Sequence, residues 1–144
     1  MRYLLDVNVW IALFDDAHSH STAANTFVSK RGLKIATCPL VENAVIRIMN
    51  LPHYGQQGGI SMARVREQLI FACQKLNHAF WPDDISMRDE KRIDFSKLHG
   101  HNQISDAYLL ALAAAQDGAL VTFDQRIVLS AVNGASTKNL VVLK

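Results

Sequence analysis

Four carboxylates in this 144-residue sequence could bind a divalent metal ion together. Asp6, Glu42, Asp106 and Asp124 each stand where an apolar run ends or where a helix is expected to begin. Clustered carboxylates repel one another and raise each other's pKa, and a hard divalent cation between them relieves that repulsion. Such a cation polarises a phosphoryl oxygen and activates a water for in-line attack. The four acids therefore predict metal-assisted hydrolysis of a phosphodiester.

The four acids are expected to have different roles. Asp6 and Asp106 are the predicted direct ligands, and Asp124 is predicted to ligate directly or through water. Glu42 is expected to hold a second ion or to orient the attacking water. Asp6 carries most of the argument, because a carboxylate that closes an apolar strand is destabilising unless something pairs with it. Asp106 is equally well explained, on its own, as an acid that caps a helix start.

Three further residues are predicted to support the acids. Asn8 is expected to hydrogen-bond Asp6 and fix its rotamer, and Thr122 is expected to do the same near Asp124. Arg126 lies one turn past Asp124 and is expected to contact a phosphate of the substrate.

Short apolar runs alternate with helical patterns along the chain, which indicates a parallel sheet covered by helices on both faces. Strands are expected at 3–7, 33–36, 79–81, 119–123 and 140–143. Helices are expected at 8–14, 18–31, 39–51, 61–78, 87–98 and 105–117. Sheets of this kind hold their sites outside the carboxyl ends of the strands, where the strand order reverses. The four acids are expected to meet there.

The composition is that of an ordinary globular domain, with 49% hydrophobic and 19% charged residues, and residues 1–144 suit a single domain. A net charge of +2 provides no general basic field, so contact with nucleic acid would need a local patch or a metal ion. Asp6 interrupts the first apolar stretch, and no apolar run approaches bilayer length; neither a signal peptide nor a membrane span is expected. Cys38 and Cys73 form no metal spacing or disulfide framework, which favours a cytoplasmic location.

Other chemistries fit these residues less well. The histidines closest in sequence stand two residues apart, which is poor spacing for zinc ligands on one helix face, and no cysteine pair completes a site. A phosphatase with Asp6 as its nucleophile would need a second acid two residues later, where Asn8 stands. A phosphate-accepting receiver domain would need a lysine after a late strand, and residues 121–124 offer none.

Four segments have a specific order and spacing: Leu-Leu-Asp-Val-Asn-Val at 4–9, Glu42, Ile-Ser-Asp-Ala at 104–107, and Thr-Phe-Asp-Gln-Arg-Ile at 122–127. In these segments the chain resembles the PIN-domain nucleases, and more closely the VapC-type toxins of bacterial toxin–antitoxin pairs. The resemblance covers nearly the whole length, and an acid fills each of the family's acidic positions. Loop 52–59 and segment 87–101 match no pattern of the family.

The resemblance implies a three-layer α/β/α fold with a five-stranded, mostly parallel central sheet. It also implies an endoribonuclease dependent on Mg²⁺ or Mn²⁺, homodimers, and inhibition by a small partner antitoxin. The expected reaction is hydrolysis of RNA with water as the nucleophile and no covalent intermediate. Two alternatives stay open: an RNA-processing nuclease of the same family without an antitoxin, and a catalytically silent domain that binds RNA or protein. Trp10, Phe14 and Phe71 are expected in the core, or else in a dimer face or a groove for a partner helix.

Overall fold

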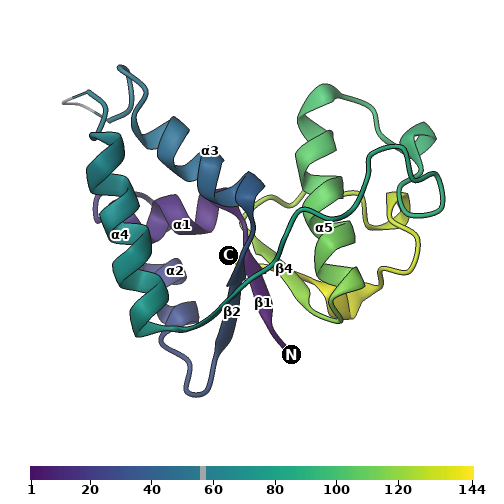
Figure 1. The fold of residues 1–144 in the computed structure, drawn as a ribbon, viewed down its shortest axis with the longest axis horizontal. Coiled ribbons are helices and arrows are strands. Elements are labelled where there is room, and N and C mark those ends of the chain that lie inside the picture. Colours follow the sequence, from purple (N-terminus) through teal and green to yellow (C-terminus); the bar gives the residue numbers. More distant parts are fainter. Residues whose placement is uncertain (56–57) are drawn as a thin grey trace.

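The computed structural model describes residues 1–55 and 58–144, and its central feature is one five-stranded sheet (Figure 1). The strands lie in the order β3-β2-β1-β4-β5, and every neighbouring pair is parallel. Their bounds are β1 Tyr3–Leu5, β2 Lys34–Thr37, β3 Asn77–Phe80, β4 Ala119–Thr122 and β5 Leu140–Val142. The predicted parallel sheet is therefore confirmed.

Five α-helices cover the sheet within the part of the chain that the structure describes: α1 Val7–Phe14, α2 Ser21–Val28, α3 Pro39–Met49, α4 Met62–Lys75 and α5 Ile104–Ala115. Figure 1 shows α1 to α4 together on one side of the sheet and α5 on the other. Helix α1 packs on α2 and α3, while α5 packs on β4 and β1. The predicted three-layer α/β/α fold is confirmed.

The strand order reverses at β1, which lies between β2 and β4. The chain leaves β1 through α1 and α2 to reach β2 on one side, and it enters β4 from α5 on the other. Leu5 is in register with Val121, and the N–H of Asp6 donates to the Val121 carbonyl oxygen at 2.9 Å. The ends of β1 and β4 therefore form the crevice in which open α/β sheets bind their ligands.

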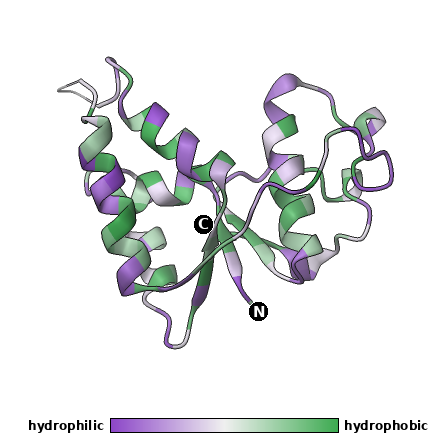
Figure 2. Ribbon diagram, in the orientation of Figure 1, coloured by the Kyte–Doolittle hydropathy of each residue, from purple (hydrophilic) through white to green (hydrophobic). Residues whose placement is uncertain are grey.

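The core lies between the sheet and both helical layers, and Figure 2 shows apolar residues along the central strands. Residues 107–113 of α5 are all buried, because this helix packs between the sheet and the C-terminal segments. Trp10 is fully buried, as expected of a core residue, and Phe14 is half-buried. Phe71 is 61% exposed on α4, so the expectation that it packs in the core is wrong.

Several element boundaries differ from the prediction for local reasons. β1 ends at Leu5, because Asp6 is the N-cap of α1 and accepts a 2.7 Å hydrogen bond from the Val7 N–H. Helix α4 ends at Lys75, three residues early, because residues 77–80 pair with β2 as an edge strand. Backbone pairing with a neighbouring strand therefore overrides the helical pattern of the preceding sequence.

The helix expected at 87–98 is wrong. This segment forms turns and one short 3₁₀ helix at Phe95–Lys97, with Asp94 as its N-cap. The segment is held by the C-terminal chain, since Ile93 bridges to Val132 and the Asp94 N–H donates to the Ala131 carbonyl at 2.8 Å. Charged side chains with little periodicity give a helix no apolar face to bury.

Loop 52–59 runs between α3 and α4, and residues 56 and 57 of this loop lie outside the described part of the chain. Tyr54 anchors the start of the loop, because its hydroxyl donates a 2.7 Å hydrogen bond to Asp15 Oδ2 at the end of α1. Among the described residues, no helix is both long and apolar enough to cross a membrane.

Candidate active site

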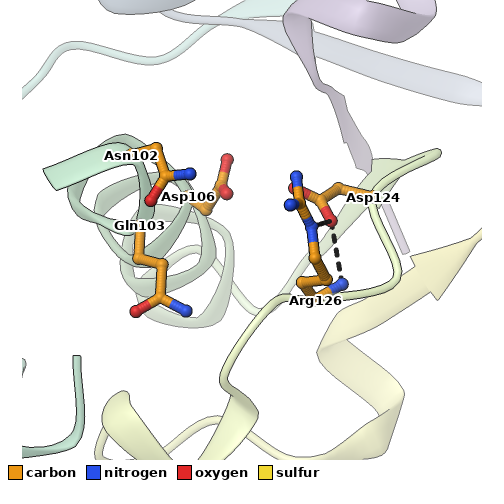
Figure 3. Close-up of a pocket in the computed structure, with 5 residues that line it drawn as sticks. All are labelled: Asn102, Gln103, Asp106, Asp124 and Arg126. Atoms are coloured by element: carbon orange, nitrogen blue, oxygen red, sulfur yellow. Dashed lines mark hydrogen bonds and ion pairs between the residues drawn. The ribbon is translucent and has the colours of Figure 1, made fainter. Parts of the chain in front are cut away.

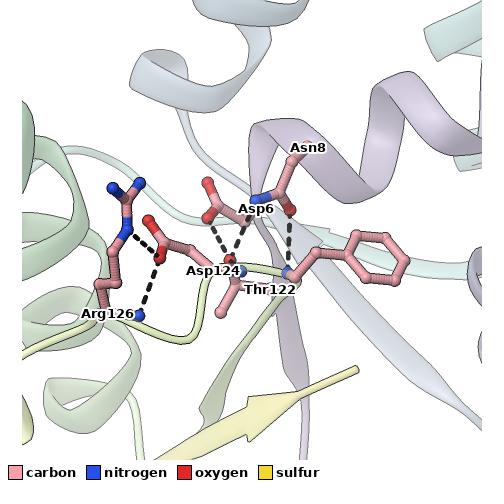
Figure 4. Close-up of polar contacts among 6 residues, drawn as sticks. Asp6, Asn8, Thr122, Asp124 and Arg126 are labelled. Carbon is pink, nitrogen blue, oxygen red and sulfur yellow. Dashed lines mark hydrogen bonds and ion pairs between the residues drawn. The ribbon is translucent and has the colours of Figure 1, made fainter. Parts of the chain in front are cut away.

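Asp6 is the most buried of the four predicted acids, with 5% of its surface exposed. It lies between β1 and α1, and both of its carboxylate oxygens accept hydrogen bonds. Oδ1 accepts from the Val7 N–H at 2.7 Å. Oδ2 accepts from the Thr122 hydroxyl at 2.7 Å, as Figure 4 shows. One carboxylate therefore both starts a helix and joins two strands.

Thr122 is the central contact of the site, and it is fully buried at the end of β4. Its hydroxyl donates to Asp6 and accepts from Asn8 Nδ2 at 3.1 Å and from the Asp124 N–H at 3.0 Å. Asn8 Oδ1 accepts from the Phe123 N–H at 3.3 Å. Asn8 therefore acts on Asp6 through Thr122, and the direct contact between Asn8 and Asp6 that the sequence suggested is not the one formed.

Asp124 and Arg126 form a compact turn just after β4. Oδ1 of Asp124 accepts from the Arg126 N–H at 2.8 Å and pairs with Arg126 Nε at 3.2 Å. The Asp124 side chain is 20% exposed, whereas that of Arg126 is 79% exposed. The backbone contact fixes the carboxylate, and most of the guanidinium stays in solvent.

Asp106 faces this group from the first turn of α5. Its pKa is raised to about 6, first by burial and then by the charges of Asp6 and Asp124, while Arg126 lowers it. The pKa of Asp6 is also raised, first by burial and also by Asp124, against the opposing effect of its hydrogen bonds to Thr122 and Val7. The charges of Asp6 and Asp124 therefore lie close enough to Asp106 to oppose its ionisation.

Glu42 lies in a separate group of contacts on the first turn of α3. Its Oε2 accepts a 2.7 Å hydrogen bond from the hydroxyl of Thr37, the last residue of β2, and that hydroxyl also lies 2.6 Å from His78 Nε2. The pKa of the Cys73 thiol is raised to about 11, mainly by burial and also by the charge of Glu42. Among the described residues, no hydrogen bond joins Glu42 to the other three acids.

A polar pocket of about 200 Å³ opens beside Asp106 and Asp124. Figure 3 shows Asn102, Gln103 and Asp106 on one wall and Asp124 and Arg126 on the other. Sequence reasoning missed the two amides. The available signal was their position four and three residues before Asp106, which places them on the same face of a helical turn.

The acids provide only oxygen ligands, which suits Mg²⁺ or Mn²⁺ better than a softer metal. Within residues 1–55 and 58–144, no three His, Cys, Asp or Glu side chains converge closely enough to hold an ion by themselves. Mg²⁺ usually keeps several of its waters and takes one or two carboxylates from the protein, so a hydrated ion between Asp6, Asp106 and Asp124 fits this arrangement. The charge repulsion that raises the pKa of Asp106 is relieved by such an ion.

The fold and this site define a class: an α/β/α protein with an acidic pocket where the order of a parallel sheet reverses. The model of the PIN domain family matches residues 3–133. The chain is therefore a member of the PIN domain family.

Curated relatives match the chain over most of its length. It is 42% identical to ribonuclease VapC44 of Mycobacterium tuberculosis (strain ATCC 25618 / H37Rv), over 99% of this chain and 100% of that protein. It is 36% identical to ribonuclease VapC39 of the same strain, over 93% of this chain and 96% of that protein. Among solved structures, VapBC2 from Rickettsia felis bound to a DNA fragment from their promoter matches all of both chains with a TM-score of 0.65 and 14% identity. This structural likeness supports the fold.

Proposed function

We propose that this protein is a ribonuclease that hydrolyses RNA phosphodiester bonds with Mg²⁺ or Mn²⁺, and that it is the toxin of a toxin–antitoxin pair. The observation that carries the proposal is the contact of Asp6 and Asp124 through one buried hydroxyl, with Asp106 facing them from α5. Proteins named ribonucleases that match 99% and 93% of the chain support the RNA substrate.

In the proposed reaction, one group of residues binds the cation and another group binds the substrate. Asp6, Asp106 and Asp124 hold the cation together with its waters. When bound, the cation supplies Lewis acidity at the phosphoryl oxygen and lowers the pKa of the attacking water. Thr122, itself held by Asn8, keeps the Asp6 carboxylate in place, and a fixed ligand loses less rotamer freedom when the ion binds.

The pocket beside the acids suits an RNA phosphate. The exposed guanidinium of Arg126 offers charged donors to phosphate oxygens, and the amides of Asn102 and Gln103 offer neutral donors across the pocket. The Gln103 side chain is held in position, because its Oε1 accepts a 2.6 Å hydrogen bond from the His99 N–H. We propose that these three side chains bind the RNA backbone and that the acids carry out the cleavage.

The proposed antitoxin contact uses an apolar groove of about 580 Å³ between α1, α2 and α4. Leu13, Phe14, Phe71 and Leu76 line it, and charged side chains of α4 stand along its rim. A groove of this composition fits the apolar face of an amphipathic helix. We also propose a homodimer, which the family resemblance implies, and a cytoplasmic location, which the free cysteines Cys38 and Cys73 favour.

The decisive experiment maps cleavage sites across total RNA for the wild type and Asp6→Asn, each with Mg²⁺ and with chelator. We expect defined cleavage by the wild type with Mg²⁺ alone and none by Asp6→Asn, with both proteins giving the same circular dichroism spectrum. Full activity of Asp6→Asn would reject the site. Failure of the wild type to cleave would favour a catalytically silent binding domain.

A second experiment separates a toxin from an RNA-processing enzyme. The wild type is expressed in a bacterial host alone and together with the product of the neighbouring gene. Growth arrest that the neighbour relieves supports the toxin, whereas an active nuclease without growth arrest supports RNA processing.

A further inference from the structure

A hydrogen-bonded chain of three side chains connects the edge of the sheet to Glu42. His78 lies in β3, Thr37 ends β2, and Glu42 lies on the first turn of α3. The Thr37 hydroxyl oxygen is 2.6 Å from His78 Nε2 and 2.7 Å from Glu42 Oε2. Thr37 is fully buried, so these two side chains are its hydrogen-bond partners in place of water.

The direction of each hydrogen bond follows from counting protons. A threonine hydroxyl has one proton to donate, and an ionised carboxylate can only accept. The proton of Thr37 therefore goes to Glu42, and the ring of His78 must donate from Nε2 to the Thr37 oxygen. Burial and the charge of Arg2 lower the pKa of His78 below its ordinary value, although the charge of Glu42 raises it. A lowered pKa favours a neutral ring, and the contact with Thr37 places its single proton on Nε2.

The same arrangement stands on the other side of β1. There Thr122 ends β4, is fully buried, donates at 2.7 Å to Asp6, and accepts from the side-chain nitrogen of Asn8. Each of the two strands beside β1 therefore ends in a buried threonine that donates to an acid and is itself fixed by a nitrogen donor. Ala36 is paired with Leu4 in the sheet, and Thr37 follows Ala36. Thr37 therefore lies beside the end of β1.

We propose that Thr37 and His78 are positioning residues that hold the Glu42 carboxylate at the carboxyl end of the sheet for RNA cleavage. The proposal rests on the proposed function and on the role that the sequence predicts for Glu42, which is to bind a second ion or to orient the attacking water. His78 does not touch the substrate in this scheme and acts only through Thr37. A contact that served only to fasten α3 to β2 would stabilise the fold without affecting the reaction, and the following experiments separate these two roles.

The first experiment reads the tautomer of His78 in the wild-type protein by long-range ¹H–¹⁵N correlation NMR without metal or RNA. We expect a single neutral tautomer with the proton on Nε2, and a mixture of tautomers in Thr37→Val. Protonation of Nδ1 in the wild type, or a pattern that Thr37→Val leaves unchanged, would overturn the proposal. This measurement is independent of nuclease activity, so it tests the hydrogen-bonded chain itself even if the wild type does not cleave RNA.

The second experiment measures kcat and the Mg²⁺ concentration for half-maximal cleavage in matched variants. Thr37→Val and His78→Leu remove the hydrogen bonds, whereas Thr37→Ser and His78→Gln keep a hydroxyl and an N–H donor. We expect the first pair to lose roughly 10- to 100-fold in activity or metal affinity, the range for losing an outer partner of a metal ligand, and the second pair to regain most of it. Exposed Thr26 on α2 provides the control Thr26→Val, which should leave both values unchanged.

A double-mutant cycle with Glu42→Gln completes the test. If Thr37 acts through Glu42, Thr37→Val should reduce the rate much less in the Glu42→Gln background than in the wild type. Equal reductions in both backgrounds, or equal losses in Thr37→Ser and Thr37→Val, would assign Thr37 and His78 to the stability of the fold alone.

Discussion

The hydroxyl of Thr122 donates a 2.7 Å hydrogen bond to Oδ2 of Asp6, and this contact joins the ends of β4 and β1. The two residues are 116 positions apart in the chain, and both are buried. A carboxylate in such surroundings needs hydrogen bonds in order to remain charged. The contact therefore supports both the fold and the ionised form of the acid that the proposed reaction uses.

Replacing Thr122 with Val should lower both stability and activity. The change keeps the shape of the side chain but leaves Asp6 and the Asn8 amide without their partner, which should reduce the free energy of unfolding by about 2–3 kcal/mol. Urea unfolding at pH 7 measures this, and cleavage of RNA should fall as well. Thr122→Ser keeps the hydroxyl and is the matched control. Equal stability of the Val and Ser variants would show that the hydrogen bond contributes nothing.

Asp106 should make the metal-free protein less stable as the pH rises. Its pKa is about 6 in the folded chain against an ordinary 3.8, so the folded state binds this proton more tightly than the unfolded state does. The contribution of Asp106 to the free energy of unfolding therefore falls as the pH rises from about 4 to about 6, and stays low above that. Asp106→Asn should be more stable than the wild type at pH 7.5 by about 1–2 kcal/mol, a figure reduced for partial exposure.

Urea unfolding at pH 4.5 and pH 7.5, in the presence of chelator, checks this effect. The advantage of Asp106→Asn should be smaller at the lower pH, where the wild-type carboxyl is mostly protonated. Asp16→Asn changes an exposed acid outside the pocket and is the control. The same advantage at both pH values would mean that ionisation of Asp106 is not the cause.

Mg²⁺ should stabilise the wild type against heat, because an ion that binds only the folded chain shifts the folding equilibrium. At a free concentration 100 times the dissociation constant, the increase should be about 2.7 kcal/mol. The melting temperature is measured with Mg²⁺ and with chelator for the wild type, Asp6→Asn and Asp16→Asn. We expect the rise in the wild type and the Asp16 variant, and little in Asp6→Asn. Equal rises in all three would place the bound ion elsewhere.

Arg126→Ala should weaken RNA binding and leave metal affinity intact. The guanidinium is 79% exposed beside the pocket, and its pairing with Asp124 opposes binding of a cation rather than helping it. Fluorescence anisotropy with a labelled RNA measures the first property, in chelator so that cleavage does not interfere. Isothermal titration with Mg²⁺ measures the second. Exposed Arg31 precedes β2 at the opposite end of the sheet, so Arg31→Ala is the control. A loss of metal affinity in Arg126→Ala would contradict the role in phosphate contact.

The sequence predicted the layers and the parallel sheet because apolar runs and helical patterns alternate along the whole chain. It also placed Asp6 and Asp124 at strand ends, since each directly follows an apolar run. Boundaries were less predictable. Asn77 and His78, predicted as the end of a helix, join the sheet because they pair with β2, and a pairing between segments some forty residues apart leaves no trace in local periodicity.

The contacts within the candidate site also could not be predicted from the sequence. Asn8 and Thr122 could be named as supporting residues, but which of them touches Asp6 depends on the register of β1 against β4. The role of His78 could not be foreseen, because it follows from β3 lying next to β2. Asn102 and Gln103 were missed because they precede α5 in a short 3₁₀ helix that carries no acid, and only the folded chain places them across the pocket from Asp124 and Arg126.

The N-cap position of Asp6 ties the folding of this protein to its chemistry. An asparagine at this position could still cap α1 through its own side-chain oxygen, so replacing Asp6 with Asn should preserve the helix start while removing the carboxylate. The pKa of Asp6 is raised mainly by burial, so the ionised form that the proposed reaction uses is less favourable in the folded chain than in water. A single base change that replaces Asp6 with Asn is therefore expected to give a protein that folds normally, lacks activity and still binds the partner of the active form.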